Sequence, residues 1–261
     1  MSPIEVPGFT AGEHTALGQT RTVYRRGKGP PILVMHEIPG ITPHVARFAR
    51  RLADEGYAVH MPLLFGTPNR PTSPSYFVQQ VTRACVSREF HVWARNESSP
   101  ITEWLRDLSR RLHRETGRPV GAIGMCLTGN FALALMVDEH LMAPVLSQPT
   151  LPFAFTRAQH SAIHVSPEQL VTIKRRVGEG AGVLGMRFTH DSLCRKPRFD
   201  RLRDELGEGF EAIEIDSGPN NAFGIPGKAH SVVTADFIDE DGHPTRAALD
   251  RLLIFFDERL R

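Results

Sequence analysis

The chain has 261 residues, of which 41% are hydrophobic and 23% charged, so it is long enough to bury a sizeable core in one globular domain. Its 31 basic and 29 acidic residues give a formal net charge of +2 and are spread along the sequence, which argues against nucleic acid or an anionic membrane as a partner. No apolar run approaches the roughly 18 residues that span a bilayer, and the polar N-terminus lacks the apolar centre of a signal peptide.

The first clear pattern is a strand, a helix and a second strand in succession. Residues 31–37 are a largely apolar run of the kind that forms a central strand buried on both faces of a parallel sheet. Thr42 supplies an N-cap and Pro43 a first-turn proline, and apolar residues then recur at helical spacing until Gly56. Residues 57–61 are typical of the next strand. This order predicts a right-handed βαβ unit.

The same alternation continues to the end of the chain. Residues 66–88 are rich in proline, serine and threonine without clear periodicity, and we expect loop with some helix there. Further helices are predicted over residues 104–113, 127–137, 166–178 and 245–260, and further strands over residues 119–125, 143–146, 183–189 and 211–216. This alternation predicts an α/β fold in which residues 1–261 form a single three-layer domain around a mostly parallel central sheet.

Cys126 lies where a predicted strand meets the helix that follows it, in the stretch GAIGMCLTGN (residues 121–130). An apolar strand that turns sharply into a helix at a nucleophile is the nucleophile elbow, usually written G-x-S-x-G, and here cysteine stands in the place of serine. Such a turn exposes the side chain at the carboxyl edge of the sheet, and the helix N-terminus favours negative charge there. The alternative is that Cys126 is a small buried side chain without a chemical role.

An acid and a base follow Cys126 at suitable places in the chain. Asp191 comes just after the strand predicted over 183–189, at its carboxyl end, where a carboxylate can orient a histidine. His230 lies between small residues in the loop after the strand predicted over 211–216. The resulting order of nucleophile, acid and base is that of α/β-hydrolases.

Other residues are weaker candidates for the acid and the base. His243 lies in a turn just before the last predicted helix, a poorer position for a base. Glu214 lies within a strand and Asp216 on the same loop as His230, so both are less well placed than Asp191 but stay open as alternative acids.

Four segments carry a resemblance to a known family. They are HEIPGITPHVARFARRLADEGYAVHMPLLFG (36–66), GAIGMCLTGNFALAL (121–135), RFTHDSLC (187–194) and KAHSV (228–232). These segments resemble the dienelactone hydrolase family of α/β-hydrolases, and the match runs over most of the chain. The resemblance implies the α/β-hydrolase fold and the hydrolysis of esters or lactones.

The resemblance also implies a set of site residues. These are a catalytic triad of Cys126, His230 and Asp191, a carboxylate at Glu37 that contacts the thiol in the resting enzyme, and an oxyanion hole made by the backbone N–H groups of Leu127 and Ile38. The expected protein is therefore a cofactor-free carboxylic ester hydrolase that forms a covalent acyl-enzyme on a small-molecule substrate. The alternative, from a different class, is an inactive α/β-hydrolase scaffold that binds a ligand or another protein.

Two departures from the family pattern qualify this expectation. Thr128 precedes Gly129 where the family commonly has two glycines, so we expect helix and strand to pack less closely. Members that bind dienelactone carry an arginine shortly after the catalytic histidine, whereas residues 231–234 here read SVVT. We therefore expect a preference for neutral acyl groups, with Arg83 or Arg88 as other possible cations.

The cysteines and histidines indicate neither disulfides nor a metal site. Cys85, Cys126 and Cys194 are odd in number and widely spaced, so we expect reduced thiols in a soluble, cytoplasmic protein. His190 and Cys194 have a helical spacing, but no nearby pair completes a tetrahedral site, and HEIPG (36–40) lacks the second histidine of H-E-x-x-H. Neither a Rossmann nor a Walker motif is present in the sequence, so no cofactor is predicted.

Overall fold

The computed structural model describes residues 4–86, 99–150 and 156–261. Its strands are β1 (Thr10–Ala16), β2 (Gln19–Arg26), β3 (Pro31–Met35), β4 (Ala58–Pro62), β5 (Val120–Met125), β6 (Leu141–Ser147), β7 (Val183–Phe188) and β8 (Phe210–Ile215). They form one sheet in the order β1-β2-β4-β3-β5-β6-β7-β8. The strands from β4 to β8 in this order pair in parallel, and β1 and β2 are added as antiparallel strands at one edge.

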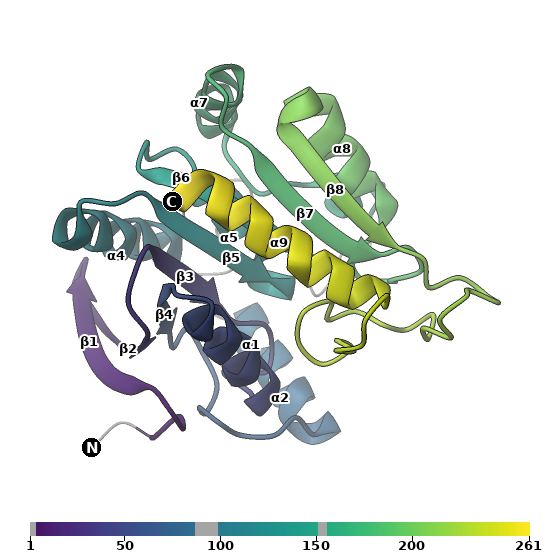
Figure 1. Ribbon diagram of the computed structural model, residues 1–261, viewed down its shortest axis with the longest axis horizontal. Helices are drawn as coiled ribbons and strands as arrows, with labels where there is room; N and C mark the ends of the chain where they lie inside the picture. The colour runs from purple at the N-terminus through teal and green to yellow at the C-terminus, as the bar shows by residue number, and fades with distance from the viewer. Residues whose placement is uncertain (1–3, 87–98, 151–155) are drawn as a thin grey trace.

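Helices lie on both faces of this sheet. They are α1 (Pro43–Asp54), α2 (Pro74–Val86), α4 (Pro100–Thr116), α5 (Gly129–Leu135), α6 (Arg157–Ser161), α7 (Pro167–Gly178), α8 (Lys196–Leu206) and α9 (Pro244–Leu260), with short 3₁₀ turns η1 (Cys126–Thr128) and η2 (Gly207–Gly209). Figure 1 shows α1 and α9 over one face, with α5 behind the sheet on the other. Within the described part of the chain, no helix has both the length and the apolar composition to cross a membrane.

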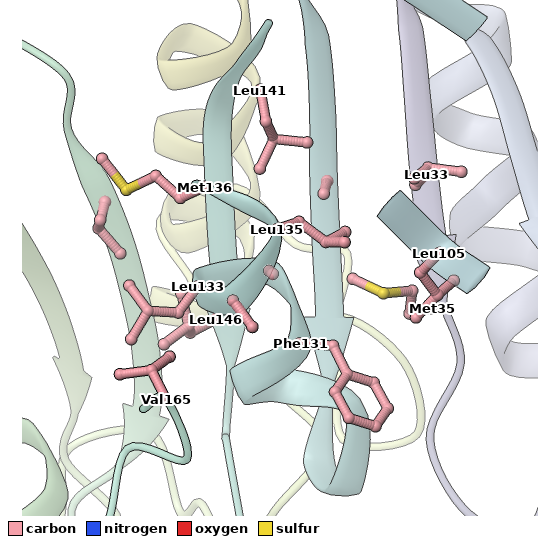
Figure 2. Packing of buried hydrophobic residues seen from close by; sticks show 14 of the residues in the cluster. Leu33, Met35, Leu105, Phe131, Leu133, Leu135, Met136, Leu141, Leu146 and Val165 are labelled. Atoms are coloured by element: carbon pink, nitrogen blue, oxygen red, sulfur yellow. The ribbon is translucent and has the colours of Figure 1, made fainter. Parts of the chain in front are cut away.

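The core is divided by the sheet into two layers. Along β3, Ile32 and Val34 belong to the core layer that contains residues of α1 and α9, whereas Leu33 and Met35 belong to the layer that contains residues of α4 and α5. All four side chains are fully buried, because a central parallel strand has helices on both faces. Figure 2 shows the second layer, in which Phe131 and its neighbours on α5 meet residues of β3, β6 and α4. The helices are thereby fixed against the strands that carry the site.

The fold class and the order of elements agree with the sequence-based predictions. Thr42 caps α1 by accepting a hydrogen bond from the Val45 N–H at 3.3 Å, and Ser166 and Gln169 form a capping box at the start of α7. The helix predicted over 127–137 is instead a 3₁₀ turn followed by α5, and the unclear region 66–88 contains α2. The sequence analysis placed no element over β1, β2 or α8.

Two glycines let the strand and the helix on either side of Cys126 approach closely. A Cβ on Gly124 would lie 2.1 Å from the backbone oxygen of Thr128, and one on Gly129 would lie 2.6 Å from Cα of Pro149. Both contacts are with backbone, which cannot move aside as a flexible side chain would. The looser packing that Thr128 led us to expect is therefore not found.

We predict that Gly124→Ala destabilises the protein by about 1–3 kcal/mol or more, because the added methyl group overlaps the Thr128 carbonyl. The matched control is Gly178→Ala at the end of α7, where an added Cβ meets nothing within 4 Å and the stability should be unchanged or slightly higher. The midpoints of urea unfolding measure both effects. Equal midpoints for the two variants would contradict the close approach of Gly124 to the Thr128 carbonyl.

Candidate active site

Cys126 occupies a strained turn at the carboxyl end of β5. Its φ angle is +54°, in the left-handed region that residues other than glycine rarely adopt. Such strain is maintained only where the surrounding structure fixes it, and it is commonly found at functional sites. The side chain is 8% exposed and lines a surface pocket. Cys126 therefore has the position and the backbone geometry of a nucleophile elbow.

Thr128 ties this turn to the neighbouring strand. Its hydroxyl oxygen accepts a hydrogen bond from the Met125 N–H at 2.9 Å and lies 2.8 Å from the carbonyl oxygen of Met35, to which it can donate. Thr128 is fully buried. The threonine in the place of a family glycine therefore connects the end of β5 to the end of β3, and this contact was not anticipated from the sequence.

His230 and Asp191 meet beside this turn. The Nδ1 atom of His230 lies 2.6 Å from Oδ2 of Asp191, and the other carboxylate oxygen accepts the Leu193 N–H at 2.8 Å. Asp191 is 5% exposed and follows the end of β7. This contact keeps a proton on Nδ1 in either charge state of the ring, so Nε2 is the nitrogen that can exchange a proton with another group.

The environment of His230 favours its protonated form. Burial alone would lower its pKa, but the neighbouring Cys126 and the hydrogen bond to Asp191 outweigh burial, so the pKa of His230 is raised well above its ordinary value. The buried Nε2 atom has no partner with full hydrogen-bond geometry among the described residues, while Cys126 is close enough to interact with the ring. An imidazolium beside the sulfur would stabilise a thiolate.

The weaker candidates for acid and base have other partners. Glu214 forms ion pairs with Arg187 at 2.8 Å and Arg203 at 2.5 Å. Asp216 accepts the Gly218 N–H at 2.9 Å, and His243 caps α9. The structure therefore brings Asp191, and none of these three residues, into contact with His230.

A carboxylate that the sequence analysis missed holds the loop of His230. Oδ2 of Asp236 accepts the backbone N–H groups of His230 and Ser231, each at 2.9 Å. Asp236 lies six positions after His230, and the two hydrogen bonds close the loop between them. A loop of this kind has no fixed residue spacing, so the role of Asp236 could not be recognised in the sequence. Asp236 therefore orients the backbone from which the imidazole extends.

Glu37 lies at the end of β3 and is 5% exposed. Its carboxylate accepts hydrogen bonds from Gln148 Nε2 at 3.1 Å, Ser231 Oγ at 2.8 Å and Thr234 Oγ1 at 2.5 Å. In the described part of the chain it forms neither an ion pair nor a hydrogen bond with Cys126. Glu37 lines the same pocket as Cys126, and its described hydrogen bonds go to these three neutral donors.

The pocket has a volume of about 250 Å³ and contains Glu37, Ile38, Cys126 and His230 in its lining. None of its described lining residues is lysine or arginine. The side chain of Arg83 and the whole of Arg88 lie outside the described residues. Larger hollows over α1 and beside the 217–227 loop do not include Cys126.

The two residues whose backbone N–H groups are expected to form an oxyanion hole lie near Cys126. Leu127 lies in the first turn after β5, where the leading N–H groups have no partner within the turn. Ile38 follows the end of β3 and lines the same pocket as Cys126. These are the two groups expected from the sequence to receive an oxyanion.

The histidine next to Glu37 is structural. His36 is fully buried, its Nε2 atom accepts the Leu64 N–H at 3.0 Å, and its Nδ1 atom lies 3.1 Å from the Glu37 carbonyl oxygen. An acceptor at Nε2 requires a neutral ring, and burial lowers the pKa of His36 to about 4. Within the described residues, no group of three or more His, Cys, Asp or Glu is arranged to hold a metal ion.

A buried arginine braces the chain that follows β6. Arg198 is fully buried on α8 and donates to the carbonyl oxygens of Pro149 at 2.6 Å, Ala162 at 2.7 Å and Gln159 at 2.9 Å. Burial lowers its pKa, and its charge acts on Cys126. No carboxylate forms an ion pair with Arg198 in the described part of the structure.

Comparisons with known proteins agree with the resemblance seen in the sequence. The model of the dienelactone hydrolase family matches residues 17–256. A protein of Saccharomyces cerevisiae named "Putative carboxymethylenebutenolidase" is 30% identical over 128 residues, which is 49% of this chain and 46% of that protein. The aligned part is therefore less than half the length of this relative.

Solved structures share the fold at low sequence identity. The "Putative Dienelactone Hydrolase" of Klebsiella pneumoniae aligns with a TM-score of 0.62 and 20% identity, over 96% of this chain and 99% of its own. A dienelactone hydrolase-like promiscuous phosphotriesterase from metagenomic libraries aligns with a TM-score of 0.62 and 19% identity. That alignment covers 97% of this chain and 100% of the phosphotriesterase. These likenesses show an α/β-hydrolase fold.

We predict that His36 makes the protein less stable in acid. The unfolded chain takes up a proton at this residue near pH 6.5, whereas the folded protein does so only near pH 4. The free energy of unfolding therefore falls as the pH drops through this window, by up to about 3 kcal/mol from this residue.

Urea unfolding at a series of pH values tests this prediction, with His36→Gln as the comparison because an amide does not titrate. The difference between the two proteins isolates His36 from the other buried histidines. The loss of stability between pH 6.5 and 4 should be shallower in the variant by about one proton. Parallel curves would contradict the prediction.

Proposed function

The chain belongs to the dienelactone hydrolase family, and we propose that it hydrolyses carboxylic esters or lactones through a covalent acyl-enzyme on Cys126. The observation that carries this proposal is the arrangement of Cys126 in a strained turn, His230 beside it, and Asp191 at 2.6 Å from the far nitrogen of the imidazole. These are the relations between nucleophile, base and orienting acid that acyl transfer requires.

The proposed reaction has two halves. His230 takes the thiol proton at Nε2, and the sulfur of Cys126 attacks the carbonyl carbon, whose oxygen receives the electron pair. The carbon–oxygen bond to the leaving alcohol then breaks, and His230 returns its proton to that alcohol. In the second half, His230 removes a proton from water, the hydroxide attacks the thioester, and the carboxylic acid leaves as the thiol is restored.

The surrounding residues have distinct parts in this scheme. Asp191 keeps the proton on Nδ1 of His230 and stabilises the imidazolium. The backbone N–H groups of Leu127 and Ile38 would hold the oxyanion. Glu37 lines the same pocket and would protect the resting thiol from unproductive oxidation.

The proposal extends to the setting in which the protein works. A nucleophilic thiol must remain reduced, so we place the protein in the cytoplasm. We propose that residues 1–261 act as one domain on a small-molecule substrate, without nucleic acid or membrane as partners. A protein with this fold and no activity would be a binding scaffold. The next two experiments distinguish an active hydrolase from such a scaffold.

We predict that wild-type protein hydrolyses nitrophenyl acyl esters and that Cys126→Ala lowers kcat/KM by about a thousandfold or more, because the nucleophile is lost. Iodoacetamide should label the wild-type protein at Cys126, as mapped by peptide mass spectrometry. Cys194 is an internal control, since it is fully buried and burial raises its pKa. Equal rates for both proteins together with an unlabelled Cys126 would favour the scaffold.

We predict that Asp191→Asn lowers kcat by about a hundredfold or more while the protein stays folded, because an amide no longer fixes the imidazole tautomer. Asp216→Asn is the matched control, as Asp216 follows the neighbouring strand but does not contact His230. Steady-state kinetics measures kcat of both variants, and circular dichroism shows whether each variant is folded. Full activity in Asp191→Asn, or an equal loss in the control, would assign the acid to another carboxylate.

A further inference from the structure

Glu37 is a buried acid whose described partners are all uncharged. Each of its contacts, from Gln148, Ser231 and Thr234, donates a hydrogen to the carboxylate. An ionised carboxylate accepts all three without needing a proton of its own. The described residues around it supply no lysine, arginine or histidine as an ion-pair partner, so its negative charge is held by hydrogen bonds alone.

This charge faces the place where a substrate would bind. Glu37 lines the same pocket of about 250 Å³ as Cys126 and His230, and no described lining residue is lysine or arginine. Water is largely excluded from a site in which Glu37 is 5% and Cys126 8% exposed. Charges interact more strongly there than in bulk solvent, so Glu37 repels a second carboxylate that enters the pocket, in opposition to the attraction of a protonated His230 in the same lining.

Thr234 supplies one of the uncharged donors to Glu37. It is fully buried on the loop that carries His230, and its hydroxyl contacts Oε1 of Glu37 at 2.5 Å. The other side of this residue is held by Arg47, whose guanidinium donates to the Thr234 carbonyl oxygen at 3.2 Å. A basic side chain in the place of Thr234 would put a cation next to the Glu37 carboxylate.

We propose that Glu37, with the neutral donors Thr234, Ser231 and Gln148, is a specificity-determining residue that excludes acyl groups bearing a carboxylate and admits uncharged ones. This inference rests on the proposed function for its substrate class, but the exclusion itself is a property of the pocket around Cys126. The lack of an arginine after His230 would only fail to attract a carboxylate. The proposal adds a charge on Glu37 that repels a carboxylate and that a substitution can remove.

Two alkylating reagents of nearly equal size test the exclusion directly. Iodoacetamide is neutral and iodoacetate carries a carboxylate, and both alkylate a thiol with loss of iodide. The rate ratio of iodoacetate to iodoacetamide at Cys126, measured by peptide mass spectrometry, is divided by the same ratio for free cysteine. We expect this normalised ratio to be about tenfold below one in wild type and to rise about tenfold in Glu37→Gln.

Variants of Thr234 separate charge from shape. Thr234→Arg should raise the ratio as Glu37→Gln does, whereas Thr234→Val, which loses the hydroxyl but adds no charge, should keep it low. Should Thr234→Arg fail to fold by circular dichroism, Glu37→Gln against wild type still decides the outcome. A wild-type ratio of one, or a ratio that Glu37→Gln leaves unchanged, would overturn the proposal.

Turnover of matched esters distinguishes this inference from the proposed function. Nitrophenyl butyrate, the nitrophenyl hemiester of succinic acid and nitrophenyl β-alaninate present a methyl, a carboxylate and an ammonium group on the same two-carbon spacer. We expect the hemisuccinate to have the lowest kcat/KM, and Glu37→Gln to narrow its gap to the butyrate. Equal turnover of butyrate and hemisuccinate would overturn the specificity proposal alone. If no ester is turned over, the proposed function fails. The ratio of iodoacetate to iodoacetamide alkylation then still tests whether the pocket excludes carboxylates.

Discussion

The arrangement at this site depends on a close contact between backbone segments beneath Cys126. Gly124 lies against the carbonyl of Thr128, Gly129 lies against Pro149, and the Thr128 hydroxyl joins the turn to the end of β3. These contacts surround the turn in which Cys126 has a φ of +54°. The parallel order of β3, β5 and β7 then brings the side chains that follow each strand to one edge of the sheet.

Much of this fold could be predicted from the sequence because the apolar runs and helix caps occur where the folded chain has its strands and helices. The apolar run before Glu37 and the Thr42 cap both indicate elements that the structure contains. The β1 and β2 strands escaped detection because their residues are mostly polar and half-exposed, as expected at an antiparallel edge. Helix α8 was missed since it starts without a side-chain cap at Arg195.

The site was predictable to the extent that its residues follow strands. Cys126 follows the end of β5 and Asp191 follows the end of β7, so their places in the sequence suggested that they would lie at the same edge of the sheet. The structure places Asp191 against His230. Asp236 and Gln148 were not predictable, because each acts through a loop conformation that only the folded chain defines. For the same reason, the hydroxyl of Thr234 on Glu37 has no sequence signature.

The buried guanidinium of Arg198 has an electrostatic consequence for the whole site. Three carbonyl dipoles solvate it in place of water, and an arginine keeps its proton across the physiological range. It therefore contributes a constant positive potential at Cys126 that does not switch off when His230 gives up its proton. Acyl transfer would thus take place beside one cation that stays charged throughout and a second, on His230, whose charge changes with each proton transfer.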